Sequence, residues 1–201
     1  MRLETRLLQS QEAGDEVVPG IQMSSTFKVD TKHIYSRESN NNRDELERLL
    51  GTLEDSLAVT YSSGLAAIYA VLTFVEPTKI YLQKGYHGTR EAMTMYGRGR
   101  SIPIIDLAFD FSGIEADEHT LIWIESPLNP RGEVADFKKL SQSAGRGFIC
   151  IDSTLAPPPI QFAMKWCHIS MHSSTKYLGG HSDLLGGVLF TKDQRIHSQV
   201  Q

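Results

Sequence analysis

After a polar N-terminal segment, short apolar runs alternate with segments that carry apolar residues at helical spacing. The runs have the length and composition of buried strands, and they fall at residues 57–61, 78–83, 102–107, 120–126, 147–152, 167–173 and 186–191. Helices are expected between them, at residues 42–55, 65–75, 89–97 and 136–145. Continuous apolar strands that alternate with helices indicate a mainly parallel sheet covered on both faces, so we predict a three-layer α/β/α sandwich.

The first expected helix has the clearest apolar face. Its leucines follow the i, i+3, i+4, i+7 pattern, and they are Leu46, Leu49, Leu50 and Leu53. Asn42 is expected to cap this helix, with Glu45 three residues further on. Residues 1–42 are interpreted as an N-terminal arm and loop, and residues 43–201 as one large domain. Residues 192–201 are polar, and we expect them to end without completing a further structural unit.

Composition narrows the function classes. The chain has 201 residues, of which 40% are hydrophobic and 22% charged, as in an ordinary α/β domain. A net charge of −4 gives no general reason to expect nucleic acid or an anionic membrane as partner. No apolar run approaches the roughly 20 residues of a membrane span, and the N-terminus lacks the apolar stretch of a secretory signal. We therefore expect a cytoplasmic protein, with Cys150 and Cys167 as free, buried thiols.

Polar residues cluster after predicted strands, at residues 62–64, 125–130, 152–154 and 172–176. Ligands of open α/β sheets bind outside the carboxyl ends of the strands, so these clusters are candidates for one site. The turn before the second helix exposes the N–H groups of Gly64 and Leu65, which suits an anion, although an ordinary capped turn has the same pattern. The histidines show no metal-site spacing, and we expect no metal.

Three side chains at or after the ends of predicted strands suggest a cofactor. Asp152 ends an apolar strand, where it could pair with a protonated ring nitrogen or act as a turn residue. Lys176 follows the hydroxyls of Ser173 and Thr175, which could bind a phosphate while the lysine forms an imine; a lone lysine is otherwise a surface charge. Tyr86 could stack on a planar cofactor or pack locally. Residues 173–176 also read S-x-x-K, but the S-D-N and K-T-G companions of penicillin-recognising enzymes are absent.

Taken in order, seven motifs resemble those of the Cys/Met-metabolism enzymes that use pyridoxal phosphate (PLP), namely cystathionine γ-synthase, cystathionine β- and γ-lyases and homoserine sulfhydrylases. The motifs are S-S-T-F (24–27), Y-S-R (35–37), S-S-G-L-A-A (62–67), Y-H-G-T (86–89), E-S-P-L-N-P (125–130), D-S-T (152–154) and H-S-S-T-K-Y-L-G-G-H-S-D (172–183). The resemblance covers nearly the whole chain, and it implies the large domain of a fold type I PLP-dependent transferase.

The resemblance also implies roles. Lys176 would bind PLP covalently, Asp152 would pair with its ring nitrogen, and Tyr86 would stack on the ring and assist proton transfer. Asn129 would lie near the 3′-oxygen of PLP and the carboxylate of a small amino-acid substrate. The phosphate would be bound by the amides of Gly64 and Leu65, by the hydroxyls of Ser173 and Thr175 and, from a neighbouring subunit, by Tyr35 and Arg37. A homodimer or homotetramer is therefore expected for the full-length form.

The implied activity is transsulfuration chemistry on cystathionine or O-acylhomoserine substrates, by β- or γ-elimination or by γ-replacement. The sequence departs from the family at Asn41 and Asn42, where the family has Pro-Thr, and at His87 and Ser153, where it has Gly and Asn. Family members are about twice as long and carry a C-terminal domain that binds the substrate carboxylate. A truncated, inactive fragment or pseudo-enzyme that at most binds PLP or a full-length partner is the second hypothesis, and an unrelated small-molecule-binding module is the third.

Overall fold

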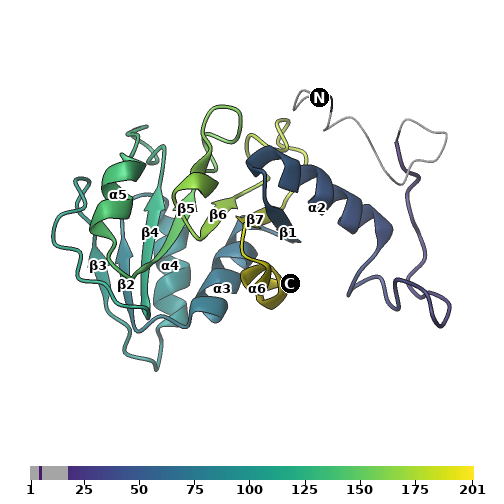
Figure 1. Ribbon diagram of the computed structural model, residues 1–201, viewed down its shortest axis with the longest axis horizontal. Helices are drawn as coiled ribbons and strands as arrows, with labels where there is room; N and C mark the ends of the chain where they lie inside the picture. Colours follow the sequence, from purple (N-terminus) through teal and green to yellow (C-terminus); the bar gives the residue numbers. More distant parts are fainter. Residues whose placement is uncertain (1–4, 6–17) are drawn as a thin grey trace.

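A computed structural model describes residue 5 and residues 18–201, and a seven-stranded sheet forms its centre (Figure 1). The strands are β1 (Leu57–Tyr61), β2 (Lys79–Leu82), β3 (Ile104–Asp106), β4 (Thr120–Glu125), β5 (Phe148–Asp152), β6 (Ile169–His172) and β7 (Gly187–Thr191). The helices are α2 (Asn41–Glu54), α3 (Gly64–Val75), α4 (His87–Tyr96), α5 (Phe137–Ser143) and α6 (Gln194–Val200), with a 3₁₀ turn η1 (Ala163–Lys165). Every predicted strand is present, with shifts of one or two residues at some ends.

The strand order is β1-β7-β6-β5-β4-β2-β3, and β2 to β6 pair in parallel with β3 at one edge. Strand β7 is antiparallel to both of its neighbours, β1 and β6. A parallel neighbour needs a long crossover, whereas residues 173–186 lead from β6 to β7 without a helix. The prediction of a mainly parallel sheet is confirmed, and β7 is the strand that departs from it.

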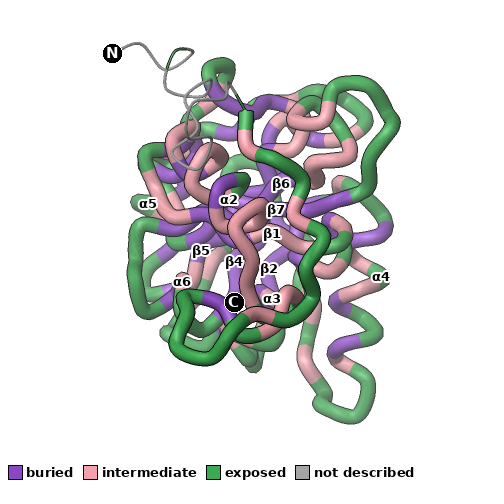
Figure 2. The backbone as a smooth tube through the Cα atoms, turned by 90° about the vertical axis from the view of Figure 1, so that its right-hand side faces the viewer, coloured by how far each residue is buried: buried purple, intermediate pink, exposed green. Residues whose placement is uncertain are grey.

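The sheet is covered on both faces, as the alternation along β4 illustrates. Leu121 and Trp123 pack into a core with α3, α4 and α6, whereas Ile122 and Ile124 pack into a second core with α5 and η1. Helix α2 lies on this second side, where Leu50 packs against buried residues of β1 and β7. Buried residues follow the strands and exposed ones the outer loops (Figure 2). The predicted three-layer α/β/α sandwich is therefore confirmed.

Helix α2 differs in detail from the prediction. Its N-cap is Asn40, whose side chain accepts the Arg43 N–H at 2.9 Å, while Asn42 instead accepts the Gln22 N–H at 2.7 Å. The expected cap at Asn42 was therefore wrong, because the preceding loop uses that side chain. Glu45 is buried and bonded to Arg48, and Leu46 is 47% exposed. The leucine pattern thus identifies the helix but not all of its buried face.

Residues 192–201, for which the sequence predicted no complete unit, contain the short helix α6. Asp193 caps α6 by accepting the Arg195 N–H at 2.7 Å. Ile196 and Val200, one turn apart, are buried in the core that contains α3. A short helix with only two apolar residues gives too weak a periodic signal against a polar background.

Residues 18–40 run away from the sheet before α2 begins (Figure 1). Several apolar side chains of this segment are 67–88% exposed: Val18, Ile21, Met23, Val29 and Ile34. The rest of the predicted arm, residues 1–4 and 6–17, lies outside the described residues. Both cysteines are free thiols, but Cys167 is half-buried rather than buried, because it lies between η1 and β6 instead of inside the sheet as Cys150 does.

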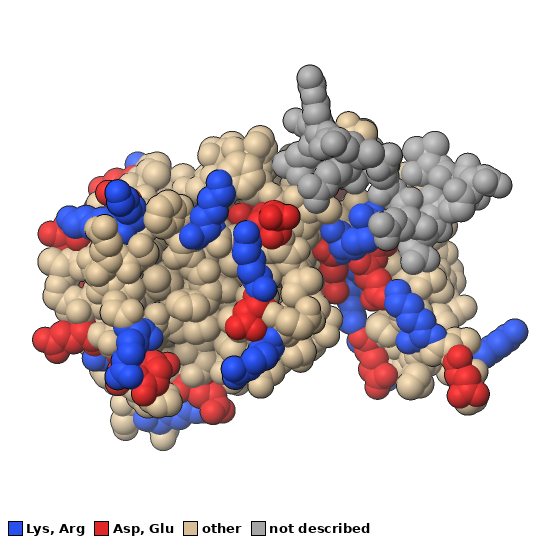
Figure 3. Space-filling view, viewed as in Figure 1, with Lys and Arg blue, Asp and Glu red and all other residues tan. Residues whose placement is uncertain are grey.

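Acidic and basic side chains are interspersed on the face drawn in Figure 3. Among the residues that the structure describes, none of the helices has the length and apolar character that a membrane crossing requires.

Candidate active site

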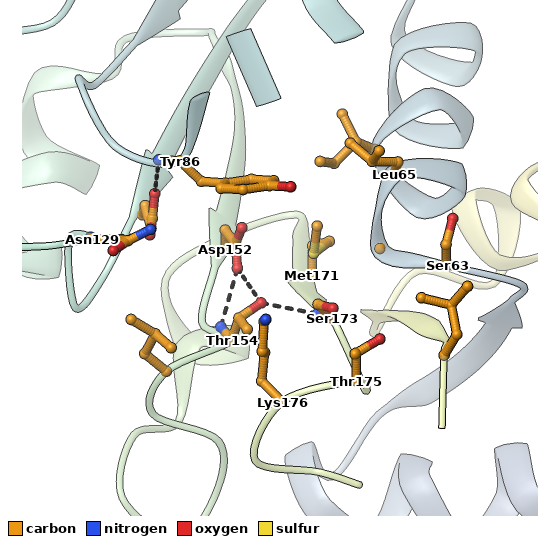
Figure 4. Close-up of a pocket in the computed structure, with 15 residues that line it drawn as sticks. Ser63, Leu65, Tyr86, Asn129, Asp152, Thr154, Met171, Ser173, Thr175 and Lys176 are labelled. Atoms are coloured by element: carbon orange, nitrogen blue, oxygen red, sulfur yellow. Dashed lines mark hydrogen bonds between the residues drawn. The ribbon is translucent and has the colours of Figure 1, made fainter. Parts of the chain in front are cut away.

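A cavity of about 240 Å³ lies at the carboxyl ends of β4, β5 and β6, beside the N-terminus of α3 (Figure 4). Eight of the ten site residues predicted from the sequence line it together: Gly64, Leu65, Tyr86, Asn129, Asp152, Ser173, Thr175 and Lys176. They lie at or after the ends of five strands, β1, β2, β4, β5 and β6, which the sheet brings to one edge. Glu125 and Thr154, for which the sequence suggested no role, line the same cavity.

Asp152 lies at the end of β5 and is only 5% exposed. Its Oδ1 accepts hydrogen bonds from the Thr154 N–H at 3.0 Å and the Thr154 hydroxyl at 2.6 Å. No described residue donates to Oδ2, which points to the side of the cavity where the Tyr86 ring lies (Figure 4). Burial raises the pKa of Asp152, against the opposing effects of the Thr154 hydrogen bonds and His172. A cationic N–H group in the cavity would therefore find a desolvated acceptor.

Thr154 connects the ends of two strands. Its hydroxyl oxygen, which donates to Asp152, also accepts the backbone N–H of Ser173 at 2.9 Å. This places the carboxyl group of β5 and the turn that follows β6 in a fixed relation. The threonine of the D-S-T motif was the available sequence signal, but its partner 19 residues away was not visible there.

The opposite end of the cavity is built to receive an anion. Ser63 caps α3 by accepting the Ala66 N–H at 3.1 Å, and the first-turn N–H groups of Gly64 and Leu65 have no acceptor within the helix. A Cβ on Gly64 would lie 3.0 Å from the Ser173 Cβ and 3.1 Å from its Oγ, so glycine allows this turn to approach closely. The hydroxyls of Ser173 and Thr175 line the same region. Amide and hydroxyl donors thus converge beside the positive end of a helix dipole.

Lys176 follows this hydroxyl pair in the turn after β6. Its backbone N–H donates to the Ser173 carbonyl at 3.2 Å, and its own carbonyl accepts the Gly180 N–H at 2.8 Å. These bonds fix the turn while the side chain extends into the cavity, with Nζ on the side of Asp152 and Ser173 (Figure 4). An amine is therefore placed between the carboxyl group and the anion-binding end.

Tyr86 and Asn129 form the wall opposite Lys176. Tyr86 precedes α4, is 40% exposed, and contacts the His87 ring edge-on at a centroid distance of 4.9 Å. Asn129 lies in the loop after β4. Glu125 joins the two, because its carboxylate accepts the Tyr86 N–H at 2.7 Å and the Asn129 N–H at 3.0 Å. Burial raises the pKa of Glu125 to about 7, and the nearby Asp152 charge acts in the same direction.

The structure does not bring Tyr35 and Arg37 to this cavity. Both lie in the segment before α2, where the Arg37 guanidinium carbon is 4.5 Å from the centroid of the Tyr35 ring. Their expected contact with a neighbouring subunit remains a prediction.

The residues present fit the cofactor that the sequence motifs suggest. A carboxyl oxygen without a partner, an amine, and a set of amide and hydroxyl donors face one cavity. PLP carries a ring nitrogen, an aldehyde and a phosphate, which are the chemical complements of these three groups.

Comparison with known proteins supports this assignment. Cystathionine γ-lyase of Saccharomyces cerevisiae is 30% identical over 204 residues, which cover 92% of this chain and 52% of that protein. A cystathionine β-lyase of Lactococcus lactis subsp. cremoris is 32% identical over 195 residues, which cover 90% of this chain and 51% of that protein. The chain thus spans about half the length of the curated relatives it matches.

Solved structures agree with the fold. A cystathionine γ-lyase from Micromonospora echinospora matches with a TM-score of 0.88 at 30% identity, over 100% of this chain and 58% of that one. A cystathionine γ-synthase from Xanthomonas oryzae pv. oryzae, in complex with aminoacrylate and cysteine, matches with a TM-score of 0.90 at 26% identity, over 100% of this chain and 57% of that one. The predicted fold type I large domain is confirmed. The family model for Cys/Met metabolism PLP-dependent enzymes matches residues 4–201, and the chain belongs to this family, whose cofactor is pyridoxal phosphate.

Proposed function

We propose that this chain forms the cofactor-binding part of an enzyme of sulfur amino-acid metabolism that acts on cystathionine or O-acylhomoserine substrates. The observation that carries the proposal is the convergence of Asp152, Lys176 and the N-terminus of α3 on one cavity. Relatives named cystathionine γ-lyase, β-lyase and γ-synthase support the substrate class. Residues 43–201 would form the large domain and residues 1–42 an arm. Location in the cytoplasm stays a prediction.

Each group of the cavity has a proposed part in holding PLP. Lys176 provides the amine for covalent attachment, and Asp152 accepts a hydrogen bond from the ring nitrogen and keeps its proton there. Tyr86 would cover the ring and exclude water, and Asn129 would lie near the 3′-oxygen. The phosphate is bound by the Gly64 and Leu65 amides and by the Ser173 and Thr175 hydroxyls. Tyr35 and Arg37 would complete this site in a neighbouring subunit of a homodimer or homotetramer.

When bound, PLP is an electron sink that makes removal of the substrate Cα proton feasible. Displaced from PLP by the substrate amine, the Lys176 Nζ, which faces the cavity, would accept that proton. Lys176 would then deliver this proton to a second carbon atom, or to a leaving group at Cβ or Cγ of the substrate. Tyr86, on the opposite wall, assists this transfer.

A second proposal is that the 201 residues bind PLP, or a full-length partner, without turning over substrate. The observation that favours it is the span of the matches, which cover about half of each relative. The two proposals make different predictions for one assay.

The test is to incubate the purified chain with PLP and cystathionine, and separately with O-acetylhomoserine plus cysteine. Cysteine with 2-oxobutanoate identifies γ-elimination of cystathionine, homocysteine with pyruvate identifies β-elimination, and new cystathionine identifies γ-replacement. Product formation that Lys176→Ala abolishes and Lys138→Ala preserves supports the enzyme; Lys138 is an exposed lysine of α5 away from the cavity. PLP binding without any product supports the second proposal. No binding of PLP contradicts the first proposal, and no binding of PLP or of a full-length relative contradicts both.

A further inference from the structure

Glu125 connects two segments that reach the cavity from different parts of the chain. It ends β4 and is 8% exposed, and each of its carboxylate oxygens accepts one backbone N–H. Oε2 accepts from Tyr86, 39 residues earlier, and Oε1 accepts from Asn129 in the next loop. Glu125 itself is fixed by its own N–H, which donates to the Gln83 side chain at 3.1 Å. One carboxylate therefore links the connection after β2 to the loop after β4.

The space between this carboxylate and Gly85 is closed. A Cβ built on Gly85 would lie 2.0 Å from Glu125 Oε2 and 2.9 Å from Leu128 Cδ1. The backbone of the β2–α4 connection therefore packs directly on the carboxylate, and residue 85 has no room for a side chain. This close approach is what lets the next N–H, that of Tyr86, reach Oε2 at 2.7 Å.

A carboxylate suits this position better than its neutral counterparts. It offers an acceptor oxygen to each N–H, whereas a glutamine amide offers one oxygen and turns a donor toward the other N–H. A protonated carboxyl has the same deficiency at its hydroxyl. Burial and the Asp152 charge raise the pKa of Glu125 to about 7, so the second acceptor is gained and lost near neutral pH. The other titratable groups that line the same cavity are Asp152 at the end of β5, Tyr86 before α4 and Lys176 after β6.

We propose that Glu125 is a positioning residue: its ionised carboxylate holds Tyr86 and Asn129 against the cofactor cavity, and loss of that charge loosens both. The consequence for PLP rests on the proposed function. The hydrogen bonds from Tyr86 and Asn129 to Glu125 do not depend on the proposed function, because both are formed within the chain.

The test compares wild type, Glu125→Gln, Glu125→Ala and the control Glu133→Gln. Glu133 lies in the same loop, but its carboxylate is exposed and bonds to the Arg131 side chain. The first readout is the amide NMR signal of Tyr86 and Asn129 without PLP. In wild type both signals should titrate with one midpoint near 7, and in Glu125→Gln that step should vanish. Hydrogen exchange at both amides should be about tenfold faster in Glu125→Ala, the factor for losing one charge-assisted hydrogen bond.

The second readout is the PLP dissociation constant between pH 6 and pH 8. The ratio of wild-type to Glu125→Gln affinity should rise about tenfold with pH, because only wild type gains a second acceptor oxygen at residue 125 as the pH rises. Glu133→Gln should follow wild type. A ratio that stays constant with pH, or Tyr86 and Asn129 amides that do not respond to either Glu125 variant, overturns the positioning role. If wild type binds no PLP, the proposed function fails, and the amide signals alone decide the role of Glu125.

Discussion

The Thr154 hydroxyl donates to Asp152 Oδ1 across 2.6 Å. The same hydroxyl accepts the Ser173 N–H, and the second oxygen of Asp152 is left to the cavity. The carboxyl group expected to face the cofactor ring is therefore oriented by a neighbour that sequence reasoning had passed over. Replacing that neighbour tests whether the orientation matters.

Thr154→Val keeps the shape of the side chain but removes the hydroxyl. We expect PLP affinity to fall about tenfold, because Asp152 loses its shortest hydrogen bond and the Ser173 N–H loses its acceptor. Thr154→Ser keeps the hydroxyl and should bind PLP nearly as wild type does. Equilibrium titration of each variant with PLP measures the difference. Equal PLP affinities of Thr154→Val and Thr154→Ser would show that the hydroxyl has no part in binding.

Gly64→Ala tests the anion-binding turn. The new Cβ would lie 3.0 Å from the Ser173 Cβ, so either the turn or Ser173 must move. We expect a loss of about 1–3 kcal/mol in the free energy of unfolding and weaker binding of PLP. Gly20→Ala is the matched control, since nothing lies within 4 Å of its added Cβ. Denaturant unfolding and PLP titration measure both effects, and a Gly64→Ala protein that binds PLP as wild type does would contradict the assignment.

The buried Glu125 predicts a pH dependence of stability. Its pKa is raised from 4.5 to about 7 in the folded chain, so the folded state binds more protons than the unfolded state between these values. The stabilisation is complete below pH 4.5 and is lost as pH rises to about 7, with an upper limit of about 3 kcal/mol. Glu125→Gln should lose less stability than wild type between pH 5 and pH 8.

Urea unfolding of both proteins without PLP, at pH 5 and at pH 8, measures this difference. His168 acts in the opposite direction, because burial lowers its pKa and its stabilisation grows as pH rises. It is present in both proteins, so its contribution cancels in the comparison. Parallel pH profiles for wild type and Glu125→Gln would show that the Glu125 pKa is not raised.

Helix α6 is expected to contribute to the stability of the core. Ile196→Ala should lower the free energy of unfolding by about 2–4 kcal/mol, because Ile196 is 7% exposed and packs into the core that contains α3. Arg195→Ala changes the neighbouring exposed position and should cost less than about 0.5 kcal/mol. Thermal or urea unfolding distinguishes the two, and equal losses would argue against a packed α6.

The strands and most site residues were predictable because each follows from a local signal. Apolar runs identify β4 and β5, and their carboxyl ends must meet at one edge of a parallel sheet, which brings Asp152 to the cavity. No local sequence signal predicts the role of a side chain that binds backbone groups far away in the sequence. Glu125 binds an N–H 39 residues earlier, so its residue type alone could not reveal its function.

Caps and helix ends were less predictable for a related reason. Three asparagines follow one another at the start of α2, and which of them caps the helix depends on the loop that contacts Asn42. The polar stretch after residue 192 hides a helix whose two apolar residues matter only because α3 lies beside them.

The central claim is that Lys176 is the attachment point for PLP. Borohydride reduction of the chain mixed with PLP, followed by peptide mapping, tests it most directly. We expect a visible absorbance band before reduction and a single labelled peptide that contains Lys176, both absent in Lys176→Ala. No label, or label spread equally over exposed lysines such as Lys138, would contradict it.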